Sequence, residues 1–383
     1  MRCLLDRANN QNRRLAATNA QTRGLGPWAV ASTYAGAIVG AGFVTGQEIQ
    51  AFFLRFHGPG WIGLATAVLL LGVAGAGLAE ASFGTDANTS GGAVAAAGDP
   101  MYQAVASMAG RTVARLAQIV VMLVAAAVLV VMVAGGAAVI GRVTGLDEQA
   151  AEWITAAAGA VFVLGQTRWV TSLNAVLIPL LLAIVATNTV VTVASAGLSL
   201  SPGPARPEVN AQLVFPALMS GAAYAAFNFV LAAAPLSYLG AHGQTAAAGF
   251  VGGWIGSGIV GILAAMEMAV MASRPAPANS ALPLIDAVAP QGGVWHVLVA
   301  SALWAAILST VVSLGWALGE SLRWPPFRPG VRAFVYVLAT PLVFPLGFAV
   351  LVRVVYPVLG AVATPFLLMW ILGPAWRRRK TRS

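Results

Sequence analysis

The stretch Ile38-Val39-Gly40-Ala41-Gly42-Phe43-Val44-Thr45-Gly46-Gln47-Glu48 decides how this chain folds. It lies within an apolar segment that is long enough to cross a bilayer, yet it carries three glycines, a threonine, a glutamine and a carboxylate. Glycine destabilises a helix interior by about 1 kcal/mol relative to alanine, and a carboxylate at membrane depth costs roughly 2.5 kcal/mol or more. These residues therefore predict a transmembrane helix that is interrupted and that lines a site.

The rest of the chain has the composition of an integral membrane protein. Of its 383 residues, 59% are hydrophobic and 9% are charged, and the mean hydropathy is +0.82. Repeated apolar runs of about 20 residues match the thickness of a hydrocarbon core. Because these runs lack the alternation of strands, their backbone groups must be satisfied within helices. The predicted fold class is an all-α integral membrane protein.

Ten membrane spans are predicted, and they divide the chain into two halves of five. The spans cover Pro27 to Phe56, Trp61 to Phe83, Val113 to Ile140, Ala150 to Gly165, Trp169 to Ala196, Leu213 to Leu239, Ala246 to Ala272, Val294 to Leu318, Val331 to Val352 and Val355 to Trp376. Shorter helices are expected at Met101 to Gly110 and at Leu282 to Ala289. Because five spans separate the first residues of spans 1 and 6, the two halves have opposite topology.

The domain organisation follows from these spans. Residues 1–26 form an amino-terminal tail, 27–196 a first five-helix repeat, 197–212 an external connection, 213–376 a second, inverted repeat and 377–383 a basic tail. With the amino terminus inside, 16 of the 21 lysine and arginine side chains are cytoplasmic and five are external, as the positive-inside rule requires. Both termini are therefore expected in the cytoplasm, in a multi-pass protein of a bacterial cell membrane.

The remaining composition excludes several partners. The basic tail lies next to a terminal span, where it is expected to contact anionic lipid rather than nucleic acid. Cys3 is the only cysteine, so neither an intrachain disulfide nor a thiolate metal cluster is predicted. The first 26 residues lack the apolar core of a cleaved signal sequence. No phosphate-binding loop or nucleophile triad is present, so the protein is not expected to be an enzyme.

Span 6 repeats the unusual pattern of span 1. Its stretch from Ser220 to Phe229 places small residues, a tyrosine and an asparagine at mid-depth, with Pro216 and Pro235 on either side. Two interrupted helices at matching positions of inverted halves indicate the binding site of a transporter. The alternative is that the glycines only allow helices to pack closely. Both interpretations stay open for span 1, whereas the six glycines of span 7 predict close packing.

Buried oxygen atoms and carboxylates are the other candidate features. In span 8, the hydroxyls of Ser309 and Thr310 either bond back to a carbonyl one turn earlier or serve as hard oxygen ligands of a cation. Glu80 lies near a span end, where its carboxylate is expected to reach headgroups or water. Glu267, near the external end of span 7, is expected to reach water, and the alternatives are contact with Glu48 or with an external arginine.

The segment from Tyr34 to Glu48 resembles the first-span signature of the YkvI-type bacterial membrane proteins, within the amino acid-polyamine-organocation superfamily. The resemblance implies the LeuT fold, a 5+5 inverted repeat in which helices 1 and 6 are discontinuous. It covers the ten-span core, although beyond the glycine-rich stretch it rests on the layout of the spans.

The resemblance also implies two binding sites. A sodium ion would be held by the carbonyls of Gly36, Val39 and Ala306 and by the hydroxyls of Ser309 and Thr310. The amides of Ala41 and Gly42 would bind a substrate carboxylate, which Tyr224, Phe227 and Asn228 would face. Phe43 and Gly46 replace residues that bind a second sodium and form an outer gate in related symporters. The aspartate and asparagine of metal-transporting relatives are missing from the first-span interruption, so divalent-metal transport is not expected.

Glu48 is expected at the external entrance to the site. It follows Gly42 by six residues, which is roughly 9 Å along a regular helix. It would take part in gating or proton coupling, attract a substrate amine or pair with Arg55.

The expected function is secondary active transport of an amino acid or related small amine-containing solute, coupled to sodium or protons. A membrane ligand sensor or an envelope assembly component is the alternative. Apart from the coupling ion, no cofactor is expected, and the partners are the lipid bilayer and a small-molecule solute.

Overall fold

The protein is described by a computed structural model that covers residues 25–83, 100–164, 168–200, 211–276, 280–288, 293–321, 329–342 and 348–380. These residues are almost entirely helical. The helices are α2 (Pro27–Ile38), α3 (Ala41–Val44), α4 (Gln47–Phe52), η1 (Leu54–Phe56), α5 (Gly60–Ala81), α7 (Pro100–Thr144), α8 (Glu148–Leu164), α9 (Arg168–Ala196), α10 (Ala211–Ala241), α11 (Ala246–Ser273), α12 (Pro283–Val288), α13 (Gly293–Ser321), α14 (Pro329–Leu338), η3 (Thr340–Leu342) and α15 (Phe348–Lys380).

The described helices confirm the all-α fold class. Seven of them are long and apolar enough to cross a membrane: they contain residues 60–81, 110–144, 176–196, 211–233, 246–273, 295–319 and 352–372. The other three predicted spans coincide with shorter helices: the first is divided among α2, α3 and α4, the fourth is α8, and the ninth is α14 with η3. The number ten therefore stays a prediction, as do the domain boundaries. Most of the basic amino-terminal tail and the centre of the 197–212 connection lie outside the described residues.

The short helices agree with the sequence, but one span boundary does not. A positive φ of 87° at Gly110 separates the beginning of α7 from its long part, which confirms a short helix before span 3. The helix α12 confirms the one expected after Leu282. Span 9 was expected to reach Val352, yet α15 already begins at Phe348. That prediction was wrong because it took Arg353 as the boundary between two spans, whereas Arg353 lies inside α15, with apolar residues on both sides of it.

The backbone of the first span leaves the helical conformation twice. Pro27 starts α2, where its fixed φ suits the first turn, and the helix ends before Val39 and Gly40. After the four residues of α3, Gly46 takes a φ of +82° and caps α4. This left-handed conformation is available to glycine without steric cost.

In contrast, α10 is one uninterrupted helix from Ala211 to Ala241. The expected interruption of span 6 was therefore wrong for this structure. The single glycine of the stretch, Gly221, packs against the backbone of Gly63 on α5. The amide of Asn228 donates to the carbonyl of Tyr224 in the same helix, at 3.0 Å. Both features are compatible with a continuous helix.

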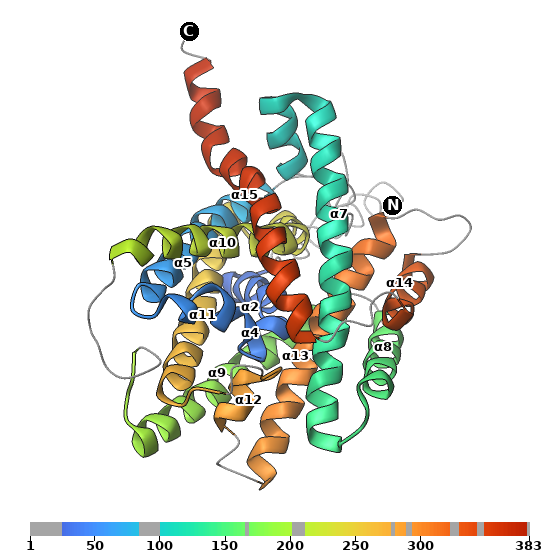
Figure 1. The fold of residues 1–383 in the computed structure, drawn as a ribbon. Coiled ribbons are helices and arrows are strands. Elements are labelled where there is room, and N and C mark those ends of the chain that lie inside the picture. Colours follow the sequence, from blue (N-terminus) through green and yellow to red (C-terminus); the bar gives the residue numbers. More distant parts are fainter. Residues whose placement is uncertain are drawn as a thin grey trace, which may run out of the picture.

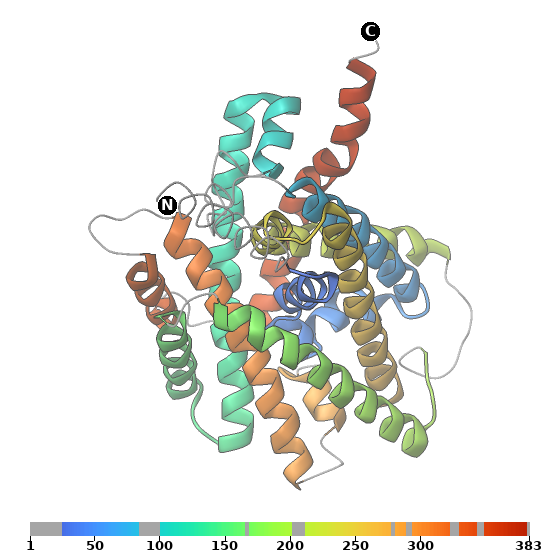
Figure 2. The same ribbon diagram turned by 180° about the vertical axis from the view of Figure 1, so that it is seen from behind.

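The first span lies at the centre of the molecule. In both views α2 and its short successors, in blue, are surrounded by α10, α11, α13 and α15 (Figure 1, Figure 2). Glycines allow this close packing, as predicted for span 7: a Cβ at Gly252 would collide with Val30, and one at Gly256 would lie 2.8 Å from the Tyr34 ring. Helices within lipid associate through such small residues. The buried polar residues of the first span are thus enclosed by the long helices α10, α11, α13 and α15.

Candidate functional site

The carbonyl and hydroxyl oxygens predicted to bind sodium come together where α2 meets α13. The hydroxyl of Thr310 donates to the carbonyl of Ala306 at 3.3 Å and lies 3.5 Å from the carbonyl of Gly36. It therefore bonds back within its own helix and also reaches across to the first span. Thr310 is 3% exposed and Ser309 is 2% exposed, so both hydroxyls are buried at this crossing.

The first interruption runs directly beside Thr310. Val39 caps α2, and a Cβ added at Gly40 would lie 3.8 Å from Cγ2 of Thr310 and 2.6 Å from Cε of Met132. A cavity of about 30 Å³ adjoins the threonine, lined in part by Ala37, Pro235 and Ser313. That volume exceeds the roughly 10–15 Å³ needed for one water molecule. The structure thus places a small, partly polar space next to the predicted cation ligands.

Glu48 does not lie at an entrance, as the sequence predicted. Its side chain is 1% exposed, and its carboxylate folds back against Gly42, where a Cβ would collide with it and would lie 2.8 Å from the Tyr356 ring. The backbone N–H of Phe43 donates to this carboxylate. The prediction was wrong because it assumed one regular helix beyond Gly42, whereas the turn at Thr45 and Gly46 redirects the chain.

The chain's own carboxylate therefore lies beside the amides that were expected to bind a substrate carboxylate. Arg55, a proposed partner of Glu48, lies elsewhere: its guanidinium is 4.6 Å from the centre of the Phe56 ring and 3.5 Å from the hydroxyl of Ser220.

Five aromatic rings pack on one another, and two of them, Tyr224 and Tyr356, lie against Glu48. The centroid distances range from 5.0 Å, between Phe53 and Tyr224, to 6.4 Å, and the cluster consists of Phe52, Phe53, Tyr224, Phe227 and Tyr356. The Tyr224 and Tyr356 hydroxyls face Glu48, but neither forms a well-aligned hydrogen bond with a described residue. We call these residues the aromatic cluster.

Of the predicted substrate residues, the structure brings Gly42, Tyr224 and Phe227 together around Glu48. Asn228 instead uses its amide within α10. Tyr356 was missed, because it is the second residue of predicted span 10 and a tyrosine at a span end is typical of the membrane interface.

A second buried carboxylate lies near Glu48. Glu267 on α11 is 1% exposed and close enough to Glu48 for the two charges to interact. Its Oε2 atom, like that of Glu48, has no hydrogen-bond partner among the described residues. The expectation that Glu267 reaches water was wrong because α4 and α12 cover its end of α11, whereas the alternative that it meets Glu48 agrees with their proximity.

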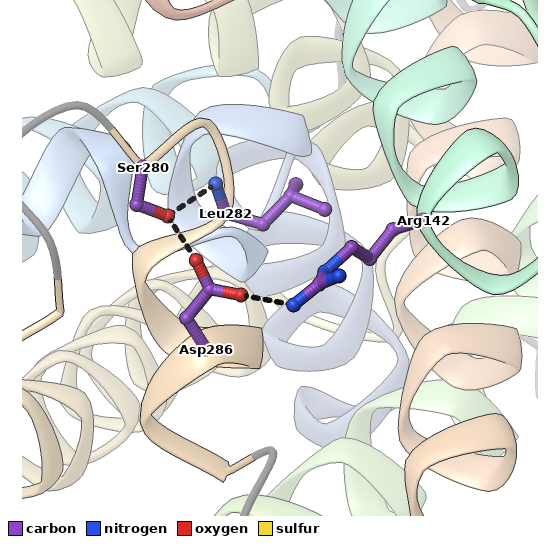
Figure 3. Close-up of polar contacts among 4 residues, drawn as sticks. All are labelled: Arg142, Ser280, Leu282 and Asp286. Atoms are coloured by element: carbon purple, nitrogen blue, oxygen red, sulfur yellow. Dashed lines mark hydrogen bonds and ion pairs between the residues drawn. The ribbon is translucent and has the colours of Figure 1, made fainter. Parts of the chain in front are cut away.

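The segment around α12 closes over the second interruption. Gln47 donates from Nε2 to the carbonyl of Ser280 at 2.6 Å, and the Leu284 N–H donates to the carbonyl of Thr45 at 3.0 Å. Figure 3 shows Asp286 accepting from the Ser280 hydroxyl at 2.6 Å and from Arg142 at 3.0 Å. Since Arg142 belongs to α7, these bonds link α4, α12 and α7.

The described residues contain no group of three or more His, Cys, Asp or Glu side chains arranged as metal ligands. No protein-family model matches the chain.

An interrupted helix enclosed by long apolar helices defines the class of the fold, which is that of the LeuT-type transporters. MhsT in complex with L-phenylalanine aligns with a TM-score of 0.61 and 12% identity, over 90% of this chain and 94% of that one. The manganese transporter of Eremococcus coleocola, in complex with an aromatic bis-isothiourea substituted compound, aligns with a TM-score of 0.60 and 18% identity, over 90% and 78%.

In sequence, the chain is similar to the uncharacterized membrane protein YkvI of Bacillus subtilis. The two are 23% identical over 358 residues, which are 91% of this chain and 96% of YkvI. The predicted resemblance to YkvI-type membrane proteins is thereby confirmed, and with it a multi-pass protein in a lipid bilayer. The likeness to solved structures extends to the fold alone.

Proposed function

We propose that this protein is a secondary active transporter that couples a sodium or proton gradient to the movement of an amino acid or related small amine-containing solute. The observation that carries the proposal is the crossing of α2 and α13, where the Thr310 hydroxyl lies between the Ala306 and Gly36 carbonyls beside the first interruption. A fold shared with transporters supports it. The proposal includes no covalent chemistry.

The cation site in this proposal is built from oxygen atoms of two helices. The carbonyls of Gly36, Val39 and Ala306 and the hydroxyls of Ser309 and Thr310 form a set suited to a hard cation such as sodium. Thr310 already bridges the helices through one donor. A cation bound beside Thr310 would accept lone pairs from the three carbonyls and both hydroxyls, so it would hold α2 and α13 together more tightly than the single hydroxyl does.

The substrate site lies on the other side of the same interruption. Its proposed components are the Ala41 and Gly42 amides with Tyr224, Phe227 and Asn228. In this structure the aromatic cluster and Glu48 fill the space above Gly42, so a solute can bind only after α4 moves away from α10 and α15. Such a movement of one element around a fixed site is the physical basis of alternating access.

The proposed topology has ten spans in a 5+5 inverted repeat, with both termini in the cytoplasm. The interruption at Val39 and Gly40 gives the chain a joint before α3, and the turn at Gly46 gives it a second joint between α3 and α4. The surrounding helices α10, α11, α13 and α15 are long and closely packed, so the movement is assigned to the segment from α3 to α4.

The proposal is tested with purified protein in liposomes. Uptake of labelled amino acids and amines is measured under an imposed sodium or proton gradient, with protein-free liposomes and gradient-free samples as controls. Gradient-dependent accumulation of at least one solute is expected. Binding of a solute without any accumulation would overturn the transporter and favour the ligand sensor, and a thermal-shift screen would detect it because a ligand stabilises the state that binds it.

A further inference from the structure

Glu48 and Glu267 are two buried carboxylates that the proposed sodium and substrate sites do not use. They come from different elements, α4 and α11, and each is 1% exposed. Where these helices meet, a Cβ at Gly46 would lie 2.7 Å from the sulfur of Met271, which follows Glu267 by one turn of α11. Each carboxylate leaves its Oε2 atom without a hydrogen-bond partner among the described residues.

No positive charge in the described part of the chain compensates the pair. Neither carboxylate forms an ion pair within the described part of the chain, where Asp286 on α12 is instead bound to Arg142. Of the titratable groups on the surrounding elements, Tyr224 on α10 and Tyr356 on α15 face Glu48. Three others have different partners: Tyr34 on α2 donates to Leu71, Arg55 on η1 lies over Phe56, and Arg274 after α11 donates to Ser195. Glu80 on α5 and Arg353 on α15 are exposed.

Two ionised carboxylates in this position would be strongly destabilising. An unpaired buried charge costs several kcal/mol even after the surroundings relax, and two like charges close together cannot both remain ionised without a further cost. Buried carboxylates without a partner lose their charge instead, by binding a proton or another cation. The pair must therefore bind a cation in the conformation seen here.

The packing around Glu48 identifies that cation. The carboxylate touches the backbone of Gly42 and lies against the tyrosine rings of the aromatic cluster, whose centroids are 5.0 to 5.5 Å from those of their neighbours. Rings at this separation are in contact. A hydrated metal ion or an ammonium group needs several ångströms of additional space, whereas a proton needs none.

We propose that Glu48 and Glu267 form a proton-binding site that is loaded while α4 is closed against α10, α11 and α15. When α4 moves away, water reaches the pair, the O–H bond of a carboxylic acid breaks, and the proton passes to water while a solvated carboxylate remains. Proton binding requires only the closed geometry. Its role in coupling rests on the proposed transport function, in which the proton would accompany the solute.

Infrared spectroscopy tests proton binding directly, because a protonated carboxyl group absorbs separately from a carboxylate. The protein in lipid nanodiscs at pH 7 should show the carboxylic acid band. The double variant with Glu48→Gln and Glu267→Gln should lose it, since glutamine keeps the shape and removes the acid. Glu80→Gln, which changes an exposed carboxylate on α5, should leave the band unchanged.

Three infrared results would contradict the proton-binding site. The proposal is overturned if the unmodified protein lacks the band at pH 7, or if the double variant retains it. Should the double variant fail to fold, the two single variants replace it, and each must alter the intensity or position of the band. If both single variants show the same band as the unmodified protein, the proposal is also overturned.

A separate measurement addresses coupling. Solute uptake by liposomes containing the unmodified protein should acidify the lumen, and the double variant should not acidify it. If no solute is taken up at all, the proposed function fails while the infrared result stands. If uptake occurs without acidification, the carboxylates bind a proton in the closed state but the coupling role is excluded.

Discussion

The first span and α10 contain similar stretches of small and polar residues, yet their backbones differ. Between Ile38 and Gln47 the helix is interrupted twice, whereas α10 continues through Gly221 and Asn228 without a break. The glycines account for much of the difference. Gly46 adopts a φ of +82° and Gly42 lies beneath the Glu48 carboxylate, while Gly221 keeps helical geometry and packs against Gly63.

The comparison shows that small size alone does not interrupt a membrane helix. Alanine is the best helix former, so the four alanines between Gly221 and Phe227 support α10. An interruption also leaves backbone groups without their helical partners, and these must be satisfied elsewhere. In the first span Glu48 accepts from the Phe43 N–H, whereas in α10 the only nearby amide side chain bonds within the helix. An interruption thus requires both a permissive glycine and an external partner.

The largest effect is expected from Gly221→Ala, which tests the packing role of the α10 glycine. Its Cβ would collide with the carbonyl group of Gly63 and lie 3.1 Å from Gly63 Cα, and backbone atoms cannot move aside as a flexible side chain can. The helices α5 and α10 must separate, with a loss of stability of about 3 kcal/mol. Thermal unfolding in detergent measures it.

The matched control for that variant is Gly77→Ala on α5. The nearest atom to its Cβ would be Trp370 Nε1 at 3.8 Å, an ordinary contact, and alanine improves helix propensity. This variant should be at least as stable as the unmodified protein. Equal unfolding temperatures for the two variants would contradict the account of Gly221.

A smaller loss is expected from Gly46→Ala, which tests the second interruption. A left-handed conformation costs a non-glycine residue roughly 1–2 kcal/mol, and the new Cβ would also lie 2.7 Å from Met271 Sδ and 3.1 Å from the Leu284 nitrogen. The expected loss is about 2 kcal/mol. Gly58→Ala is the control, since a Cβ there would meet no atom within 4 Å. If both variants unfold at the same temperature, a side chain at position 46 causes no backbone strain.

Thr310→Ala tests the first interruption through function. Removing the hydroxyl takes away a group that reaches the carbonyls of both Gly36 and Ala306. If the crossing of α2 and α13 binds sodium, the sodium concentration for half-maximal uptake should rise about tenfold, or about 1.4 kcal/mol, and Ser309→Ala should act in the same direction.

Two variants separate binding from helix packing at this position. Thr310→Ser retains the hydroxyl and should preserve the sodium dependence. Thr189→Ala removes a hydroxyl on α9 that bonds only within its helix, to the Val185 carbonyl at 2.8 Å, so it should leave the sodium dependence unchanged. Unaltered sodium dependence in Thr310→Ala would exclude the cation site.

The sequence predicted the helices well because their length and apolar character are set locally by the bilayer. It also located the first interruption, where the glycines concentrate. It misplaced Glu48 because the turn at Gly46 depends on contacts with α11 and α12, which lie more than 200 residues away in the chain. Tyr356 was missed for a similar reason, since only the fold brings it to Gly42.

The smallest effect is expected from Asp286→Asn, which weakens the link between α12 and α7. The ion pair with Arg142 is solvent-accessible, with side chains 22% and 51% exposed, and such pairs contribute roughly 0.2–1 kcal/mol. Asparagine can still accept from the Ser280 hydroxyl, so the turn before α12 should persist. The loss should fall below about 1 kcal/mol and vanish in 1 M salt, where the screening length shrinks to about 3 Å.

Comparison with Gln47→Ala shows which bond holds α4 closed. Gln47 is buried and donates to the Ser280 carbonyl at 2.6 Å, so its removal leaves a buried acceptor unsatisfied, at a cost of about 1–3 kcal/mol, and salt should not change that loss. If Asp286→Asn proves the more destabilising of the two, or if its effect is insensitive to salt, the Arg142 pair rather than the buried amide holds α12 over the second interruption.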